Sequence, residues 1–170
     1  MPRLFFAIEP AEDALRALAE AAAAVARELG GRAVPPGKIH LTLAFLGEVP
    51  DSRIAAAESA AEGAGGAPFT LRLDRLGVFR RAGVAWAGAS APDPALIRLQ
   101  ETLAAQLVGR GFDLERRPFA PHVTLARRTD RTLRETAFEP VAWRVTEFAL
   151  VRSDLSTGGY ERLRRWPLAG

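Results

Sequence analysis

The spacing of apolar side chains predicts three amphipathic helices. Over residues 11–29 the apolar positions recur every three or four residues, and Gly30-Gly31 follow as a helix stop. Asp51 or Ser52 can cap a second helix that continues to about residue 62. A third helix begins at the Pro-Asp-Pro sequence of residues 92–94 and runs to about residue 108. Each helix has an apolar side that can cover a sheet.

Short apolar runs and strict alternation predict the strands. Residues 69–76 alternate between apolar and polar side chains, which is typical of a half-buried strand. Strands are predicted at residues 4–8, 39–46, 69–76 with a continuation to 79, 84–89, 122–127, 141–153 and 160–166. Residues 128–140 are polar and are predicted to be irregular.

The chain has two histidines, and both open the same short pattern. His40 and His122 are each followed by one apolar residue, then Thr, then Leu. Side chains two apart in a strand point to the same face, so His40 and Thr42 share one face, and so do His122 and Thr124. Two such strands side by side would present two imidazoles and two hydroxyls to one groove.

Each histidine also ends a longer repeat of strand, helix, Pro-containing loop and histidine strand. Phe6 precedes His40 by 34 residues, and Trp86 precedes His122 by 36 residues. This repeat predicts an α+β fold of two pseudo-symmetric lobes within a single domain, residues 1–170. Mostly antiparallel sheets would line a central cleft, with the helices outside. Alternating strands and helices are also typical of parallel units, so the strand direction stays open.

Paired imidazoles suit phosphoryl chemistry. One neutral imidazole can act as a base while a second, protonated one acts as an acid, and hydroxyl groups can donate to phosphate oxygens. A structural, hydrogen-bonded histidine is the simpler explanation for one such motif, but two copies favour a shared site. A two-histidine metal site is the other alternative. The chain has no cysteine, and neither motif contains an acidic residue, so no metal or cofactor is expected.

Composition and charge indicate what type of ligand the protein binds. The net charge is +3, and the basic residues are arginines except Lys38. Arginine binds phosphate through a planar fork of donors, although most surface arginines are simply solvated. The composition, 48% apolar and 25% charged, is ordinary for a globular protein. No targeting or membrane segment is evident, and the lack of cysteine fits a cytoplasmic location.

Three segments resemble the two-histidine phosphoesterase superfamily, and within it the bacterial and archaeal RNA 2′,3′-cyclic phosphodiesterases, historically called 2′-5′ RNA ligases. These segments are residues 3–8 (RLFFAI), 40–48 (HLTLAFLGE) and 118–127 (PFAPHVTLAR). Residues 145–148 (VTEF) also fit, so the resemblance spans nearly the whole chain. It implies a bilobal fold with both motifs in a central cleft. It also implies metal-independent hydrolysis of RNA 2′,3′-cyclic phosphate ends to 2′-phosphate ends.

The resemblance also implies roles for the motif residues. His40 would protonate the departing 3′ oxygen, and His122 would activate water. Thr42 and Thr124 would hold the phosphate.

For two further positions in the motif strands, more than one role or residue is possible. The resemblance favours Arg127 as a phosphate ligand, whereas strand alternation puts Arg128 on the histidine face; we favour Arg127. Alternation puts Phe45 on the apolar face, so it is predicted to be core, with base stacking as the alternative.

The expected partner is RNA with a cyclic phosphate end, such as a tRNA fragment or a nucleotide, bound by a monomer without membrane contact. Two other functions stay open. One is hydrolysis of a small cyclic nucleotide or nucleotide-sugar cyclic phosphate, and the other is RNA binding without turnover. The family also joins RNA ends through a 2′-5′ bond, and the sequence does not say which direction matters in the cell.

Overall fold

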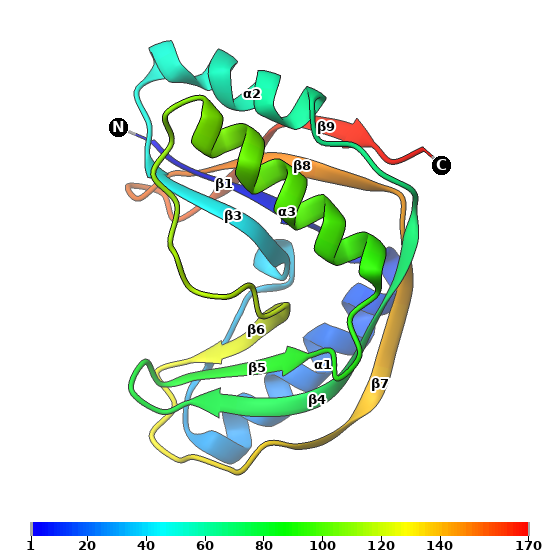
Figure 1. The fold of residues 1–170 in the computed structure, drawn as a ribbon. Coiled ribbons are helices and arrows are strands. Elements are labelled where there is room, and N and C mark those ends of the chain that lie inside the picture. Colours follow the sequence, from blue (N-terminus) through cyan, green and yellow to red (C-terminus); the bar gives the residue numbers. More distant parts are fainter. Residues whose placement is uncertain (1, 170) are drawn as a thin grey trace.

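The computed structural model describes residues 2–169 and arranges them as two lobes that share one antiparallel sheet (Figure 1). The strands are β1 (Arg3–Ile8), β2 (Arg32–Ala33), β3 (Leu41–Glu48), β4 (Phe69–Phe79), β5 (Val84–Gly88), β6 (His122–Arg127), β7 (Thr136–Val145), β8 (Glu147–Ser153) and β9 (Tyr160–Pro167). The helices are α1 (Glu12–Leu29), α2 (Ile54–Glu62) and α3 (Pro94–Gly109), with 3₁₀ turns η1 (Pro36–Lys38) and η2 (Asp51–Arg53).

The sheet order is β7-β4-β5-β6-β3-β1-β8-β9, and the short strand β2 pairs with Ala126 and Arg127 on the edge of β6 away from β5. The first four strands form one lobe and the last four form the other. Among the described residues, the strands of the two lobes pair only at Leu41 and Val123, between β3 and β6. Within each lobe the repeat is visible as β1 beside β3 and β5 beside β6, all antiparallel. The expectation of pseudo-symmetric lobes with antiparallel sheets is therefore confirmed.

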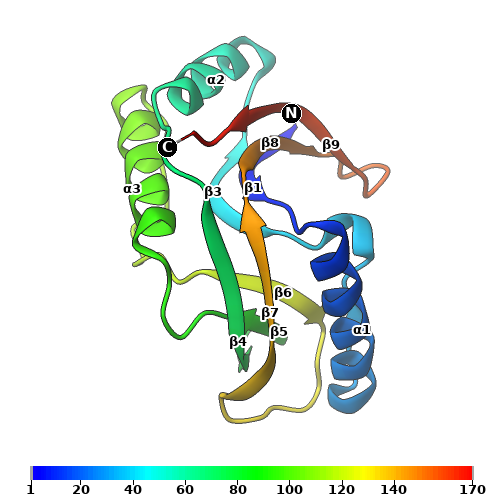
Figure 2. The same ribbon diagram turned by 90° about the vertical axis from the view of Figure 1, so that its right-hand side faces the viewer.

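Each helix of the repeat contacts the lobe that does not contain the strand before it. α1 follows β1 but packs against β6, β2 and β7 of the other lobe, whereas α3 follows β5 and packs against β3 of the other lobe and β4 of its own (Figures 1 and 2). α2 lies on α3 and β9. The helices thereby interlock the two lobes, which the sheet joins at one residue pair. Nothing among the helices of residues 2–169 has the length and apolar character needed to cross a membrane.

Burial explains why β1 is apolar without alternation. Leu4, Phe6 and Ile8 belong to the main core beneath the helices, whereas Phe5 and Ala7 belong to a second cluster on the opposite face of the sheet. A strand that is covered on both faces needs apolar residues at every position. Phe5, a member of the second cluster, stacks on the His40 ring.

Two strand predictions and one cap prediction are wrong in detail. β7 begins at residue 136, inside the segment predicted to be irregular, and the predicted strand 141–153 is divided at Thr146. The division follows from the two lobes, because β7 pairs with β4 in one lobe and β8 pairs with β1 in the other. Neither Asp51 nor Ser52 caps α2, which begins after η2. By contrast, the Asp93 carboxylate caps α3 by accepting from the Ala95 N–H at 2.8 Å.

Candidate active site

The two histidine motifs meet where the lobes join. Leu41 and Val123, the apolar residues of the two H-x-T motifs, form the pair that links β3 to β6, and both are fully buried. In an antiparallel pair, the neighbours of these residues project from the opposite face of the sheet. His40, Thr42, His122 and Thr124 are those neighbours, and all four are half-buried. The junction of the lobes thus gathers both imidazoles and both hydroxyls on one face.

Each imidazole is held by the same backbone contact. The Nδ1 atom of His40 lies 2.7 Å from the carbonyl oxygen of Lys38, and that of His122 lies 2.8 Å from the carbonyl oxygen of Ala120. A carbonyl oxygen only accepts, so Nδ1 carries the proton in both rings. This leaves Nε2 of each ring for chemistry. At His40 this atom accepts from the Thr42 hydroxyl at 2.9 Å.

His40 lies between aromatic rings. The Phe5 ring stacks on the imidazole with centroids 4.8 Å apart, and the Tyr160 ring contacts it edge-on at 5.7 Å. Burial is the main reason why the pKa of His40 is lowered from its ordinary value. The positive charges of Arg127 and Arg162 lower this pKa further, whereas the Lys38 carbonyl and Glu9 oppose the shift. The free protein therefore favours the neutral form of His40.

A β-bulge follows the threonine in both motif strands. In β3, Thr42 pairs with Ala7 and Ala44 pairs with Phe6, so Leu43 has no partner. In β6, Thr124 pairs with Trp86 and Ala126 pairs with Ala85, so Leu125 has none. An unpaired residue of this kind reverses the alternation of the side chains that follow it, up to the next irregularity, which in β3 lies at Leu46. Residues five positions after each histidine therefore return to the histidine face.

These two residues are Phe45 and Arg127. Phe45 is 53% exposed and lines a groove together with Thr42, so the prediction that it belongs to the core is wrong. The bulge at Leu43 is the physical reason. Arg127 is exposed at the end of β6, and its charge acts on both His40 and Tyr160. Arg128 follows the strand with a positive φ of 55°.

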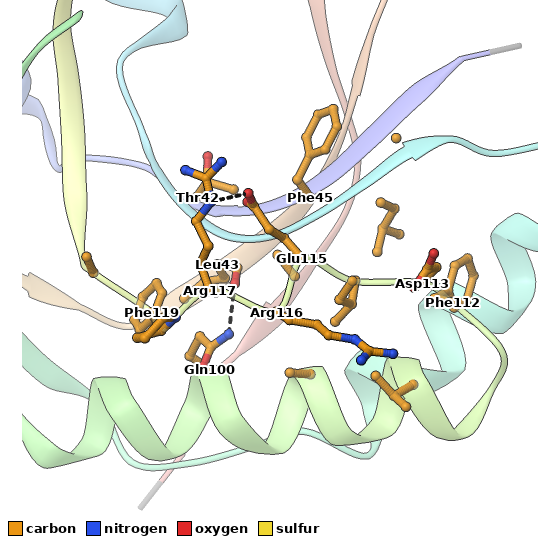
Figure 3. A pocket seen from close by; sticks show the side chains of 18 of the residues that line it. Thr42, Leu43, Phe45, Gln100, Phe112, Asp113, Glu115, Arg116, Arg117 and Phe119 are labelled. Carbon is orange, nitrogen blue, oxygen red and sulfur yellow. Dashed lines mark hydrogen bonds and ion pairs between the residues drawn. The ribbon is translucent and has the colours of Figure 1, made fainter. Parts of the chain in front are cut away.

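The groove beside His122 has a volume of about 950 Å³ and lies between β3, α3 and the loop of residues 112–120. Phe79, 42% exposed, contacts His122 edge-on with ring centroids 5.3 Å apart. Figure 3 shows the loop side chains over the groove, where Arg117 pairs with Glu115 at 2.8 Å beside Thr42. Arg116 also lines it. Exposed aromatic rings and arginines thus extend along the groove from the two motifs.

His122 also borders a second cavity of about 520 Å³. Trp86 and Phe79 line this cavity, and their rings lie 5.5 Å apart. Gly77 and Gly88 lie against the indole of Trp86, and a Cβ atom at either position would collide with it. His122 is therefore open on two sides, unlike His40.

The sequence did not identify several residues around the motifs. Glu9, Tyr160 and Arg162 surround His40, and Phe79 and Trp86 surround His122. They come from other strands or, for Glu9, from the residue after β1, and no local pattern connects them to the imidazoles. Tyr160, as the single tyrosine of the chain, was the one available signal. Within residues 2–169, no group of three or more His, Cys, Asp or Glu side chains is arranged to hold a metal ion.

The chain is similar in sequence and in structure to several known proteins. Residues 4–157 match the 2′-5′ RNA ligase superfamily. The RNA 2′,3′-cyclic phosphodiesterase of Escherichia coli (strain K12) is 38% identical over 171 residues, which cover 98% of this chain and 96% of that protein. The protein of the same name from Thermus thermophilus is 36% identical, covering 99% of this chain and 91% of its own length. The crystal structure of E. coli LigT complexed with 3′-AMP superposes with a TM-score of 0.90 at 34% identity and covers all of both chains.

Proposed function

The chain belongs to the 2′-5′ RNA ligase superfamily, and we propose that it hydrolyses the 2′,3′-cyclic phosphate ends of RNA to 2′-phosphate ends. The observation that carries this proposal is the junction of β3 and β6. There, two H-x-T motifs share one face of the sheet, and Nδ1 of each imidazole bonds to a backbone carbonyl. The relatives at 36–38% identity, which are named RNA 2′,3′-cyclic phosphodiesterases, support the same activity.

In the proposed mechanism, His122 acts as the base. Its neutral Nε2 takes a proton from a water molecule, and the water oxygen bonds to phosphorus. The open surroundings of His122 leave room for that water. The bond from phosphorus to the 3′ oxygen breaks, and the protonated Nε2 of His40 supplies the proton that this oxygen needs. The 2′ ester remains, so the product carries a 2′-phosphate.

Substrate binding would favour the protonated form of His40. Burial disfavours the imidazolium in the free protein, so the pKa of His40 is lowered there. A cyclic phosphodiester carries one negative charge, and a nearby negative charge favours the imidazolium. Substrate binding is therefore proposed to raise the pKa of His40 and to prepare the acid. The Thr42 hydroxyl, which donates to Nε2 in the free protein, would turn to a phosphate oxygen.

Thr124 and Arg127 complete the proposed phosphate site. Thr124 is the counterpart of Thr42 in the second motif, and its hydroxyl would donate to another non-bridging oxygen. The bulge at Leu125 supports Arg127 rather than Arg128, because it returns residue 127 to the histidine face. A guanidinium there would neutralise the charge that develops on phosphate oxygens.

The groove suggests RNA rather than a small cyclic phosphate. Its volume of about 950 Å³ is at the upper end of the range for small-molecule pockets, roughly 300–1,000 Å³. Single-stranded RNA is bound by stacking of bases on aromatic rings and by basic contacts to the backbone. Phe45 and Phe79 offer the rings, and Arg116 and Arg117 offer the charges. We propose that the terminal base stacks on Phe45.

The same groups would catalyse the reverse reaction when a 5′-hydroxyl group replaces water, which forms a 2′-5′ bond. Because one chain supplies both histidines, the proposed active species is a monomer. A cytoplasmic location and substrates such as tRNA fragments or nucleotides remain part of the proposal.

The experiment is incubation of a short RNA with a 2′,3′-cyclic phosphate end in excess EDTA, in parallel with nucleoside cyclic phosphates. We expect full activity on the RNA and a product that co-migrates with the 2′-phosphate standard. Activity that is lost in EDTA and restored by a divalent ion would overturn the metal-independent mechanism. A 3′-phosphate product would reverse the assignment of the leaving oxygen. Binding without turnover would identify an RNA-binding protein instead.

A further inference from the structure

The orientation of His40 depends on the turn that precedes it. Gly37 and Lys38 belong to η1, and the Lys38 carbonyl oxygen accepts the Nδ1–H of His40 at 2.7 Å. This hydrogen bond fixes both the tautomer of the ring and the direction of Nε2. Whatever holds the turn therefore also sets the position of Nε2.

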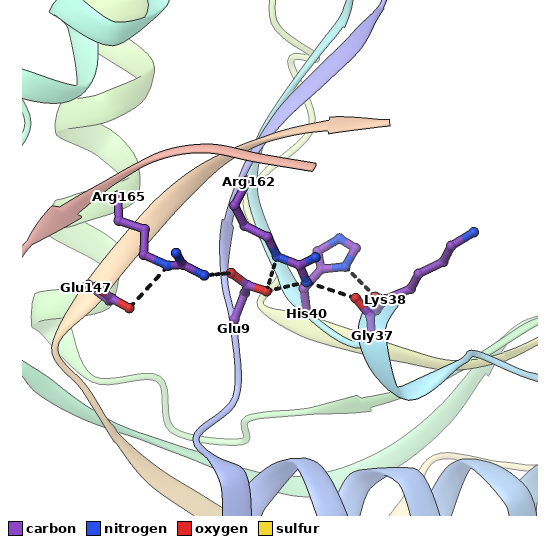
Figure 4. Close-up of polar contacts among 7 residues, drawn as sticks. All are labelled: Glu9, Gly37, Lys38, His40, Glu147, Arg162 and Arg165. Atoms are coloured by element: carbon purple, nitrogen blue, oxygen red, sulfur yellow. Dashed lines mark hydrogen bonds and ion pairs between the residues drawn. The ribbon is translucent and has the colours of Figure 1, made fainter. Parts of the chain in front are cut away.

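Arg162, on β9, ties this turn to the rest of the lobe (Figure 4). Its Nη2 donates to the Gly37 carbonyl oxygen at 2.9 Å, and its Nε donates to the Glu9 carboxylate at 2.7 Å. Nη2 contacts the same carboxylate oxygen. The Arg162 side chain is 27% exposed and that of Glu9 is 26% exposed, so solvent screens the pair only in part. A guanidinium with several fixed contacts has little freedom to move.

Glu9 is itself held in place. It follows β1, and its second carboxylate oxygen lies 3.7 Å from Nη2 of Arg165, whose Nε is 3.5 Å from Glu147 (Figure 4). The network thus joins the end of β1, the turn η1 and strand β9, which are far apart in the sequence. Tyr160, two residues before Arg162 on β9, contacts the imidazole itself. Strand β9 therefore contacts both the His40 ring and the turn that orients it.

We propose that the Glu9–Arg162 pair is a positioning device for His40. It immobilises η1 and thereby the Lys38 carbonyl, so that Nε2 is presented to the phosphate in one tautomer and one orientation. Neither side chain contacts the substrate in this proposal. The inference rests on the proposed function, because the benefit of a fixed Nε2 is proton delivery to the leaving oxygen.

The second motif lacks an equivalent. The Ala120 carbonyl, which accepts from Nδ1 of His122, lies in the loop that lines the groove. Within the described part of the chain, no charged side chain bonds to residues 118–121. The positioning pair is therefore specific to the histidine to which the acid role is assigned.

Two variants distinguish the effect of positioning His40 from the effect of charge on its pKa. Arg162→Gln removes a positive charge and Glu9→Gln removes a negative one, so they move the pKa of His40 in opposite directions, up and down respectively. Loss of positioning instead acts in the same direction in both. We expect kcat on an RNA with a cyclic phosphate end to fall at least about tenfold in each variant, with KM changed by less than about twofold. Arg162→Lys keeps the charge and one donor and should recover part of the loss.

The second measurement needs no substrate. In the free wild-type protein, ring ¹⁵N chemical shifts should report a single tautomer of His40 with the proton on Nδ1. Both Gln variants should give a mixture of tautomers at a temperature well below their melting points. The matched control is Arg152→Gln, which breaks the exposed pair with Glu161 between β8 and β9 and should leave kcat and the tautomer unchanged.

Two results would overturn the inference. One is a kcat that rises in one Gln variant and falls in the other, as charge alone dictates. The other is an unchanged tautomer in both. A wild-type protein with no activity on cyclic phosphate ends would defeat the proposed function, while the ¹⁵N measurement would still decide whether the pair positions His40.

Discussion

The two histidine half-sites, residues 40–45 and residues 122–127, open with the same local pattern but have different surroundings. Both rings donate Nδ1–H to the carbonyl two residues earlier, and a bulge follows both threonines. His40, however, is enclosed by Phe5 and Tyr160, and the turn that precedes it is hydrogen-bonded to Arg162. His122 instead lies between two cavities. The repeated motif supplies two imidazoles, and the neighbouring strands give them different surroundings.

This difference fits a division of labour. An acid must deliver its proton to one leaving oxygen, so a fixed and enclosed ring suits that role. A base must receive a water molecule, or a hydroxyl group in the reverse reaction, so an open ring suits that role. The residues five positions after each histidine differ in the same way, because one half-site supplies an aromatic ring, Phe45, and the other a charge, Arg127.

The largest expected effect tests what the half-sites share. His40→Gln and His122→Gln should each lower kcat by about 10²–10⁴, the usual contribution of general acid or base catalysis. The double variant should be little worse than either single one, because the two groups act in one step. Turnover of a cyclic-phosphate-ended oligonucleotide is the measurement, with RNA binding as the control. A single variant with near wild-type turnover would contradict a role for that histidine.

Arg127 tests the charged side of the second half-site. Arg127→Gln removes a charge-assisted hydrogen bond to phosphate worth about 1.5–3 kcal/mol, so kcat/KM should fall roughly 10- to 100-fold. The loss should be similar for every base, because the phosphate is common to all substrates. Arg128→Gln is the matched control and should have little effect. A greater loss in the Arg128 variant would favour the position given by simple strand alternation.

Phe45 tests the aromatic side of the first half-site. Phe45→Ala should weaken binding of a nucleotide by about 1–3 kcal/mol, the usual value of stacking between a base and an aromatic ring. The effect should appear in KM and should vanish for a cyclic phosphate that lacks a base. Phe45→Tyr keeps the ring and serves as the control. An equal loss for substrates with and without a base would instead indicate a structural role.

The smallest expected effect is a shift in the pH dependence of activity, which tests the lowered pKa of His40. If His40 must be protonated, activity falls as the pH rises through its pKa. Burial lowers this pKa in the free protein, so the alkaline limb of kcat/KM should lie below the ordinary value of about 6.5. The limb of kcat should lie at higher pH, because the bound anion raises the pKa of His40.

Imidazole titration by NMR would test this directly, because the chain has two histidines. His122→Gln would assign the remaining resonance to His40. Arg127→Gln removes a positive charge that lowers the pKa of His40 and should move its titration to higher pH. A movement to lower pH would contradict the assigned charge effect.

Much of the architecture follows from the sequence because it depends on local periodicity. All three predicted helices form, and the alternation in the two motifs gives the burial of Leu41 and Val123 beside half-buried histidines. The predictions failed where alternation was extended beyond Thr42. The bulge at Leu43 depends on the pairing of β3 with β1, and no local signal in the sequence marks it. Similarly, the division of residues 141–153 depends on which lobe each half joins.

The sequence alone determined the two histidine motifs, their repetition and the position of each His-Thr pair on one face of its strand, because these depend on residue identity and on the two-residue period of a strand. Only the tertiary structure decided that the strands meet at Leu41 and Val123, and that bulges return Phe45 and Arg127 to the site. It also placed Tyr160, Arg162 and Glu9 around His40. These features depend on strand register and on contacts between distant segments, which the whole packed chain fixes and no short stretch of sequence encodes.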